Sequence, residues 1–189
     1  MIFRPALIVL SALALAACRE DSAELPPPSA MTAEAVGYYC QMDLLEHPGP
    51  KAQAHLDGQL APLFFSQVRD VVAYMRMPEQ SHGVIVAYVS DMAAPEASWD
   101  DPGAENWIAA DSAHYVVGSA IAGGMGADEI VPFSSREAAQ TFAERNGGTV
   151  MALAEIPDSA VLAPVDDGDA GAEEDFLRRL EALTPDEES

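Results

Sequence analysis

The sequence predicts an α+β fold in which two tandem ββαβ units, related by pseudo-twofold symmetry, form one compact globule. Two stretches repeat one order of features: a strand that ends in Phe-Ser, a helix that begins near the serine, a glycine turn and a closing strand. They begin at "PLFFSQVRDVV" and "IVPFSSREAAQ". A β-like stretch precedes each, "VGYYCQM" in the first unit and "SAHYVVGS" in the second. A single α+β domain without internal symmetry is the alternative.

The first unit is expected to cover residues 34–92. A proline near the start of "QLAPLFF" predicts that this strand lies at a sheet edge or carries a bulge, because proline lacks the N–H that a central strand needs. Ser66 is a suitable N-cap for the helix "QVRDVVAYMRM", in which apolar side chains recur at helical spacing. The run "GVIVAYV" is rich in β-branched residues and completes the unit as a buried strand.

The second unit is expected to cover residues 107–163, after a linker at 93–106 that is rich in Pro, Gly and Asp. Ser134 or Ser135 is the predicted cap of the helix "SREAAQTFAER". An Asn-Gly pair ends that helix, and a Gly-Gly pair turns the chain into the closing strand "TVMALAEI".

The N-terminus has the features of an export signal. Residues 1–17 carry one arginine followed by an apolar run that is too short to span a bilayer comfortably. The run ends in "LAAC", which resembles a bacterial lipobox, so that cleavage before Cys18 and lipidation of its sulfur are expected. An ordinary signal peptide that ends near a cysteine is the alternative. Residues 18–33 contain three consecutive prolines and are predicted to be an extended spacer that holds the folded part away from the membrane.

The net charge of −22 limits the classes of partner. It argues against nucleic acid, and against binding to anionic lipid by charge, because both are polyanionic. The segment 164–189 is especially acidic and poor in aromatic residues, and it is predicted to be mostly disordered. Within it, "AEEDFLRRLEAL" has the spacing of a short amphipathic helix.

Cys40 is the thiol that needs an explanation. Export places it in a compartment that permits disulfides, and with Cys18 lipidated it has no partner in the mature chain. Met42 is two residues away, and in a strand such residues point to the same side. A thiolate and a thioether together form a soft donor pair that favours Cu(I) over harder divalent ions. A buried cysteine and a methionine that fills the core are the alternatives.

Two further residues are candidate ligands. Met125 lies in the glycine-rich stretch "GSAIAGGMGADE", outside any periodic apolar segment, and we expect it on a flexible loop from which it reaches a ligand. A solvent-exposed loop methionine or a lid over an apolar patch is the alternative. His114 holds the place in the second unit that Cys40 holds in the first, and the alternative is a strand histidine bonded to backbone. The other histidines lie in predicted turns and are expected to be solvated: His47, His55 and His82.

No catalytic constellation accompanies these residues. The glycine run lacks the Gly-Lys-Ser/Thr and Gly-x-Gly-x-x-Gly patterns of phosphate loops. A nucleophilic cysteine needs a base and an orienting group, and the sequence places no nucleophile elbow or helix N-terminus at Cys40. We therefore expect a protein that is not an enzyme.

The lipobox, the proline-rich spacer, "YCQM" and the block "SAHYVVGSAIAGGMGADEIVPFSSREAAQTFAERNGGTV" together resemble the NosL family of nitrous oxide reductase accessory lipoproteins. The resemblance implies a Cu(I)-binding chaperone that supplies copper to an ABC-type maturation complex, and through it to the copper–sulfide centre of nitrous oxide reductase. It also implies a copper site built on Cys40 and Met42, joined by Met125. His114 is the candidate for a histidine ligand.

The resemblance implies a periplasmic, lipid-anchored protein. Arg19 follows Cys18 where an aspartate would resemble an inner-membrane retention signal, which favours the outer membrane as the anchor site. Two other classes of function remain open from the residues. A thiol-dependent organometal lyase has similar βαβ units but needs at least two cooperating thiols. A structural or docking lipoprotein would bury Cys40.

Overall fold

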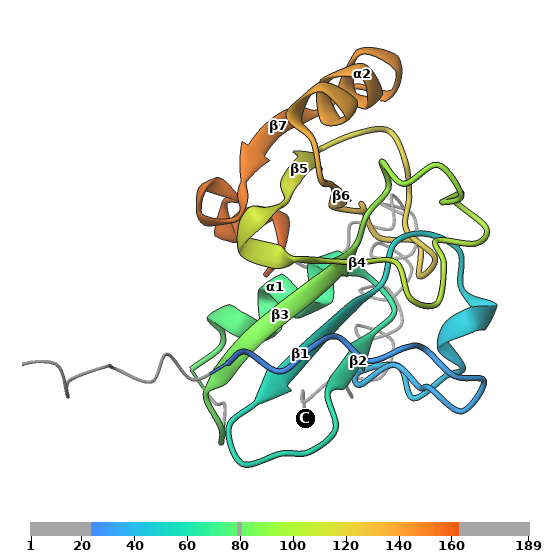
Figure 1. Cartoon of the computed structure of the whole chain (residues 1–189). Coiled ribbons are helices and arrows are strands. Elements are labelled where there is room, and N and C mark those ends of the chain that lie inside the picture. Colours follow the sequence, from blue (N-terminus) through green and yellow to red (C-terminus); the bar gives the residue numbers. More distant parts are fainter. Residues whose placement is uncertain (1–23, 79–80, 163–189) are drawn as a thin grey trace, which may run out of the picture.

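The computed structural model describes residues 24–78 and 81–162, which form two small antiparallel sheets and two α-helices (Figure 1). The predicted signal peptide at 1–17, the lipidation site Cys18 and the acidic segment 164–189 lie outside these residues. Within the described part, no helix has the length and apolar character needed to cross a membrane.

Both predicted ββαβ units are present. The first unit consists of β1 (Ala52–Leu56), β2 (Leu63–Phe65), α1 (Val68–Arg76) and β3 (Val84–Ser90). The second consists of β5 (His114–Val117), β6 (Val131–Phe133), α2 (Arg136–Asn146) and β7 (Thr149–Ala152). The strand orders β2-β1-β3 and β6-β5-β7 are equivalent, with the first strand of each unit in the middle. This confirms the tandem repeat and the edge position predicted for β2.

Two elements differ from the expectation. The first strand of the first unit is β1, and not the stretch 36–42. Its sequence "AQAHL" alternates apolar and polar residues, and all five are buried because both faces of the strand are covered. β4 (Trp107–Ala109), which was expected to open the second unit, pairs with β3 and extends the first sheet. It does so because the free edge of β3 offers backbone groups that need partners.

One hydrophobic core joins the two units. The inward face of the first sheet, α1 and one face of the second sheet contribute to it, with Val71, Val89, Tyr115 and Ile130 among its buried residues. The hydroxyl of Tyr115 donates to the carbonyl of Ala110 at 2.7 Å, so that this fully buried ring leaves no unpaired polar atom. Each fully buried aliphatic side chain contributes roughly 1.5–3 kcal/mol to such a core. The shared core accounts for the single globule.

α2 covers the opposite face of the second sheet. Strand alternation places Val116 and Phe133 on that face, where they pack against Ala139 and Phe142 of the helix. The hydroxyl of Ser135 accepts a hydrogen bond from the third backbone N–H of α2 at 3.1 Å, which confirms the predicted cap. The second sheet therefore lies between α2 and the first unit.

The outer face of the first sheet is covered by the N-terminal segment, residues 24–36, drawn blue in Figure 1. The side chain of Gln53 accepts from the Ser29 N–H at 2.8 Å and donates to its carbonyl at 2.9 Å. The hydroxyl of Tyr88 donates to the carbonyl of Pro26 at 2.7 Å, and Met31 is buried. The spacer predicted at 18–33 is thus part of the fold from Pro26 onward, because buried polar side chains on the sheet need its backbone.

His55 was expected to be solvated in a turn, and this is wrong. It lies in β1 on the outer face, with Nε2 3.1 Å from the side-chain oxygen of Gln53 and its ring edge-on to Tyr88. Burial lowers the pKa of this imidazole, because the charged form loses hydration there. The outer face of the sheet is therefore a second packed layer.

The N-terminus of α1 is capped by the second unit. Ser66 is not the cap as predicted, because Gln67 occupies the N-cap position and makes no side-chain capping bond. Instead Oε1 of Glu129 accepts from the Val68 N–H at 3.1 Å. A carboxyl oxygen at a helix N-terminus satisfies a donor that the helix leaves free.

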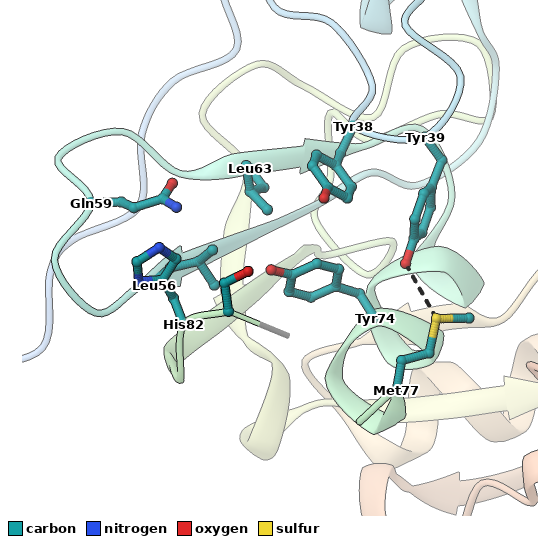
Figure 2. A pocket seen from close by; sticks show the side chains of 9 residues that line it. Tyr38, Tyr39, Leu56, Gln59, Leu63, Tyr74, Met77 and His82 are labelled. Carbon is teal, nitrogen blue, oxygen red and sulfur yellow. Dashed lines mark hydrogen bonds between the residues drawn. The ribbon is translucent and has the colours of Figure 1, made fainter. Parts of the chain in front are cut away.

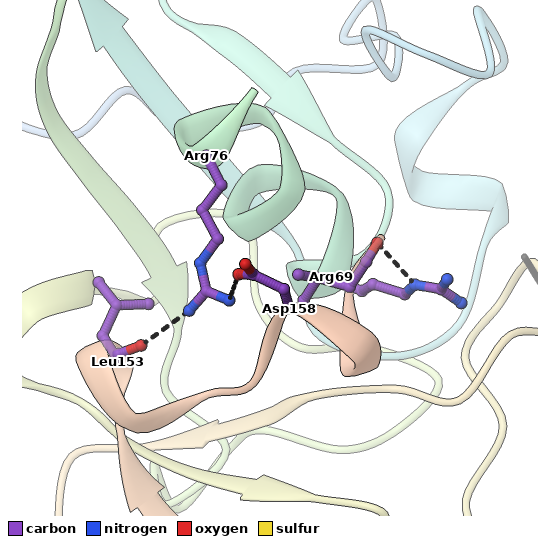
Figure 3. A network of polar contacts seen from close by, with 5 residues as sticks. Arg69, Arg76, Leu153 and Asp158 are labelled. Atoms are coloured by element: carbon purple, nitrogen blue, oxygen red, sulfur yellow. Dashed lines mark hydrogen bonds and ion pairs between the residues drawn. The ribbon is translucent and has the colours of Figure 1, made fainter. Parts of the chain in front are cut away.

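The arginine side chains of α1 bind the end of the second unit (Figure 3). Arg76 forms an ion pair with Asp158 at 2.8 Å and donates to the carbonyl of Leu153 at 3.3 Å. Arg69 donates to the carbonyl of Val161 at 3.4 Å. Asp158 is well exposed, so that the ion pair itself adds little stability, and its contribution is to fix where the chain end lies.

Glu129 is buried beside two charged groups. Burial raises its pKa to about 8, the backbone N–H bonds and Lys51 oppose the rise, and Asp70 adds to it. Lys51 is also buried, and its ammonium donates to the carbonyls of Pro48 and Gly49. Burial lowers the pKa of Lys51 to about 8, against the attraction of Glu129.

Replacing Gln53 with leucine should free the N-terminal segment from the sheet. The backbone N–H and carbonyl of Ser29 would lose their partners, at a cost of about 1–3 kcal/mol in the free energy of unfolding. Urea unfolding measures this cost, and amide exchange at Ser29 should accelerate. Gln59→Leu in the exposed turn after β1 is the control and should change neither. Unaltered exchange at Ser29 in Gln53→Leu would show that the segment is held by other contacts.

The stability of the protein should depend on the titration of Glu129. Its pKa in the folded state lies above its usual value, so the folded state binds this proton more tightly. The free energy of unfolding therefore falls as the pH rises from 4.5 to about 8, with a slope that approaches about 1.4 kcal/mol per pH unit. Glu129→Gln should remove this part of the slope. Parallel pH profiles of wild type and Glu129→Gln, measured by denaturant unfolding, would contradict the expectation.

Candidate metal site

Cys40 and Met42 lie in a tight turn and not in the strand predicted for them. The Gly37 N–H donates to the Met42 carbonyl at 3.0 Å, and the Gln41 N–H donates to the Gly37 carbonyl at 2.8 Å. Gln41 has a φ of 55°, which no strand residue adopts. The expectation that strand alternation aligns the two sulfurs is therefore wrong, and both residues lie instead in one closed turn.

The turn is fixed to the edge of the first sheet. Its first residue, Gly37, bridges to Phe64 of β2, and the Tyr38 N–H donates to the Phe64 carbonyl at 2.7 Å. A side chain at Gly37 would not fit, because a Cβ there would lie 2.5 Å from the sulfur of Cys40. The backbone of the turn thus packs directly under the thiol.

The thiol of Cys40 faces the start of α1. Its Sγ lies 3.5 Å from the hydroxyl oxygen of Ser66, two residues before the helix. Cys40 is half-buried, while the side chain of Met42 is 40% exposed. A partly accessible thiol beside an exposed thioether can exchange a ligand with solvent or with another protein, which a fully buried cysteine cannot do.

The tyrosines that precede Cys40 anchor the turn from the other side (Figure 2). The rings of Tyr38 and Tyr39 contact those of Phe65 and Tyr74, with centroids 5.1 to 6.5 Å apart within the group. Such aromatic pairs contribute about 0.5–1.5 kcal/mol each beyond burial. The Tyr39 hydroxyl donates to the sulfur of Met77 at 3.8 Å. A pocket of about 260 Å³ lies beside these rings, and His82 also lines it.

Met125 is carried by a hairpin that packs on the first unit. The Gly123 N–H donates to the Ala127 carbonyl at 2.7 Å, and Ala122 bridges to Asp128. Two glycines make the packing possible. A Cβ at Gly123 would overlap the side-chain amide of Gln67 and lie 2.7 Å from Oε2 of Glu129. A Cβ at Gly124 would lie 2.7 Å from the carbonyl oxygen of Pro48.

The packing of these two glycines argues against a flexible loop at Met125. The expectation was a flexible loop, whereas the two glycines before Met125 are closely packed against the first unit, and the methionine after them is 41% exposed. The close approach explains the glycines better than flexibility does, because only a residue without Cβ allows such contact. The structure thus fixes the backbone and leaves the thioether accessible.

The two residues that precede α1, Ser66 and Gln67, are the common neighbours of both sulfur-bearing segments. Ser66 contacts the thiol of Cys40, and the next residue, Gln67, contacts the Met125 loop at Gly123. Both segments lie on the right in Figure 1. The structure therefore places the segments that carry Cys40, Met42 and Met125 beside the start of α1, although not through the predicted strand, and their joint binding of a metal stays a prediction.

His114 does not lie with these residues. It is in β5, opposite Phe133 and Ala152, and these face α2. The adjacent residue Tyr115 faces the first unit, so that His114 points away from it. The proposed equivalence of His114 and Cys40 is wrong, because β5 corresponds to β1 in the strand order. Its Nδ1 is buried and, among the described residues, has no hydrogen-bond partner.

Sequence reasoning missed two residues near the sulfurs. His47 was expected to be solvated, yet its Cβ would lie 3.1 Å from a Cβ at Gly124, and its Nε2 is buried with no partner in the described part of the chain. Glu129, which follows the Met125 loop, is 1% exposed. The signal for Glu129 was its place directly before the apolar run "IVPF", as the second of two adjacent acids; His47 gave no signal beyond its closeness to Met42.

The donor set at this end of the molecule is dominated by sulfur. Among the described residues, no group of three or more His, Cys, Asp or Glu side chains is placed to hold a metal ion, so the usual zinc ligands are not assembled there. One thiol and two thioethers instead match the preference of soft, monovalent copper. The arrangement can bind a soft metal ion near the surface.

A family model described as NosL matches residues 28–161. A "Copper-binding lipoprotein NosL" of Achromobacter cycloclastes is 59% identical over 179 residues, covering 93% of each chain. A second protein of that name, from Stutzerimonas stutzeri, is 31% identical over 158 residues, covering 82% of this chain and 80% of the relative.

A solved structure agrees with these relatives. The copper chaperone NosL of Shewanella denitrificans, known from a crystal structure, is 32% identical and superposes with a TM-score of 0.65. The match covers 71% of this chain and 99% of that one, so both ββαβ units fall within a known architecture. The sequence, the fold and the matched length together show that this chain belongs to the NosL family.

Proposed function

We propose that this protein binds Cu(I) through Cys40, Met42 and Met125 and acts as a copper chaperone rather than as an enzyme. The observation that supports the proposal is that the thiol of Cys40 contacts Ser66 while the loop of Met125 packs on the next residue, Gln67, with Met42 and Met125 about two-fifths exposed. Thiolate and thioether favour the monovalent ion. The relatives are named as copper-binding proteins, which supports the same metal.

Partial exposure suits delivery. A chaperone must hold the ion and then pass it on, which requires that an incoming ligand can reach the metal before the last donor leaves. Met42 and Met125 offer this access, while the thiol of Cys40 is the more sheltered donor. We infer that a methionine is exchanged first and Cys40 last.

The cellular location of the protein and the recipient of its copper are inferred from the family. We propose that the protein is anchored in the periplasm through a lipid on Cys18, in the outer membrane rather than the inner one. We propose further that it delivers copper to an ABC-type maturation complex, and so to the copper–sulfide centre of nitrous oxide reductase. The lipoprotein names of the relatives support the anchor.

The alternatives are less well supported by the geometry. An organometal lyase needs cooperating thiols, and Cys40 is the one free cysteine among the described residues. A purely structural role would place Cys40 in the core, whereas its side chain is half-buried at the surface of the first unit.

Anaerobic titration of the mature protein with Cu(I), in competition with a chromophoric Cu(I) chelator, tests the site. One equivalent should bind to the wild type. Cys40→Ser should abolish binding because a hydroxyl is a hard donor. Met125→Leu should weaken it by about tenfold, or ~1.4 kcal/mol, because one sulfur is lost while the fold remains. Met151→Leu, in β7, is the control. Stoichiometric binding by Cys40→Ser would disprove the site.

The two histidines should behave differently. We propose that His47, whose free Nε2 lies in the segment beside the Met125 loop, supplies a nitrogen donor. His47→Ala should then weaken Cu(I) binding by about tenfold, whereas His114→Ala should leave it unchanged. The same chelator competition measures both. The reverse order would show that the metal draws on the α2 face of the second sheet.

A further inference from the structure

We propose that Glu129 is a positioning residue for the copper site: its buried carboxyl group fixes the loop that carries Met125 against the helix start that Cys40 contacts. The inference rests on the proposed function. It assigns a role to a residue that does not itself bind the metal.

The hydrogen bonds of Glu129 connect the two ββαβ units. Oε1 of Glu129 accepts from the Val68 N–H at 3.1 Å and from the Ile130 N–H at 3.0 Å. The first of these donors is 61 positions away in the other ββαβ unit. One oxygen atom therefore links the start of α1 to the strand that follows the Met125 loop.

A sulfur-bearing segment lies on each side of this hydrogen-bonded link. Toward the first unit, Ser66 stands two residues before Val68 and contacts the thiol of Cys40 at 3.5 Å. Toward the second unit, Oε2 of Glu129 would be 2.7 Å from a Cβ at Gly123, two residues before Met125. The carboxyl group thus lies between the two sulfur-bearing segments.

Burying the carboxyl group of Glu129 carries a cost in folding free energy. Glu129 is 1% exposed, and its Oε2 has no hydrogen-bond partner among the described residues. Burial of a carboxyl group with an unpaired oxygen disfavours folding, and the two hydrogen bonds that Oε1 accepts offset only part of this cost. A requirement for the geometry of the site explains why the acid stands there.

The structure predicts a different result for each replacement. Glu129→Gln keeps a carbonyl oxygen that can accept from Val68 and Ile130, so it should rescue the geometry and bind Cu(I) within about twofold of the wild type. Glu129→Leu has no acceptor and should weaken binding by about tenfold, as loss of a supporting residue commonly does. X-ray absorption of the Cu(I) protein should show one sulfur fewer.

A double-variant cycle separates positioning from general destabilisation. If Glu129 acts through Met125, Glu129→Leu combined with Met125→Leu should bind no more weakly than Met125→Leu alone. Gln53→Leu is the matched control, because it also replaces a buried polar side chain but lies on the outer sheet face, and it should leave Cu(I) binding unchanged. In the apo-protein, Glu129→Leu should accelerate amide exchange at Gly123 and Gly126.

The inference is overturned if Glu129→Leu binds Cu(I) like the wild type, or if its effect adds fully to that of Met125→Leu. Should Glu129→Leu fail to fold, Glu129→Asp takes its place. It keeps the functional group but withdraws the carboxyl group by one methylene, and the same loss of one sulfur is expected. If the wild type itself binds no Cu(I), the proposed function fails, and the amide exchange result still decides whether Glu129 holds the loop.

Discussion

The arrangement of this molecule depends on the contact between the buried carboxyl group of Glu129 and the first backbone N–H groups of α1. The first N–H groups of a helix have no partner within the helix, and here a residue from the other unit accepts from the first of them, the Val68 N–H. The shared core supplies most of the burial, but it is non-directional. The capping bond is directional, and it sets how the Met125 loop lies relative to the turn of Cys40.

The proposed site is consequently a property of the interface between two repeats. Cys40 and Met42 come from a turn at the edge of the first sheet, and Met125 comes from a hairpin of the second unit. The contacts of Arg69 and Arg76 hold the end of the second unit along the same helix. α1 therefore carries the contacts that position the second unit relative to the first. A small shift of one repeat against the other would alter the separation of the sulfur donors without changing either one locally.

The sequence was sufficient for features that depend on local chemistry. The cap at Ser135, the glycine turn after α2 and the edge position of β2 follow from short patterns, and the order of these features revealed the repeat. It was insufficient where tertiary contacts override local preference. The polar residues of β1 are buried under the N-terminal segment, which no local pattern indicates, and Gln41 adopts a left-handed conformation that its residue type does not predict.

Residue type identified the candidate ligands, but it did not predict how they are arranged. Soft donors are rare enough that Cys40, Met42 and Met125 stood out, whereas the aligned strand that was meant to join them is absent. His114 was selected through an incorrect register of the repeat. Glu129 and Gln67 belong to the site's support, and their partners are distant in sequence, so that no local pattern could have indicated them.

The docking of the N-terminal segment on the outer sheet face has a consequence for orientation. That segment enters on the left of Figure 1 and crosses the sheet before it reaches the turn of Cys40 on the right. With a lipid on Cys18, the membrane tether would leave the globule on the side opposite the sulfur atoms. The tether would then hold the globule so that the end with the proposed copper site faces away from the lipid headgroups. That end would be open to soluble or integral partners.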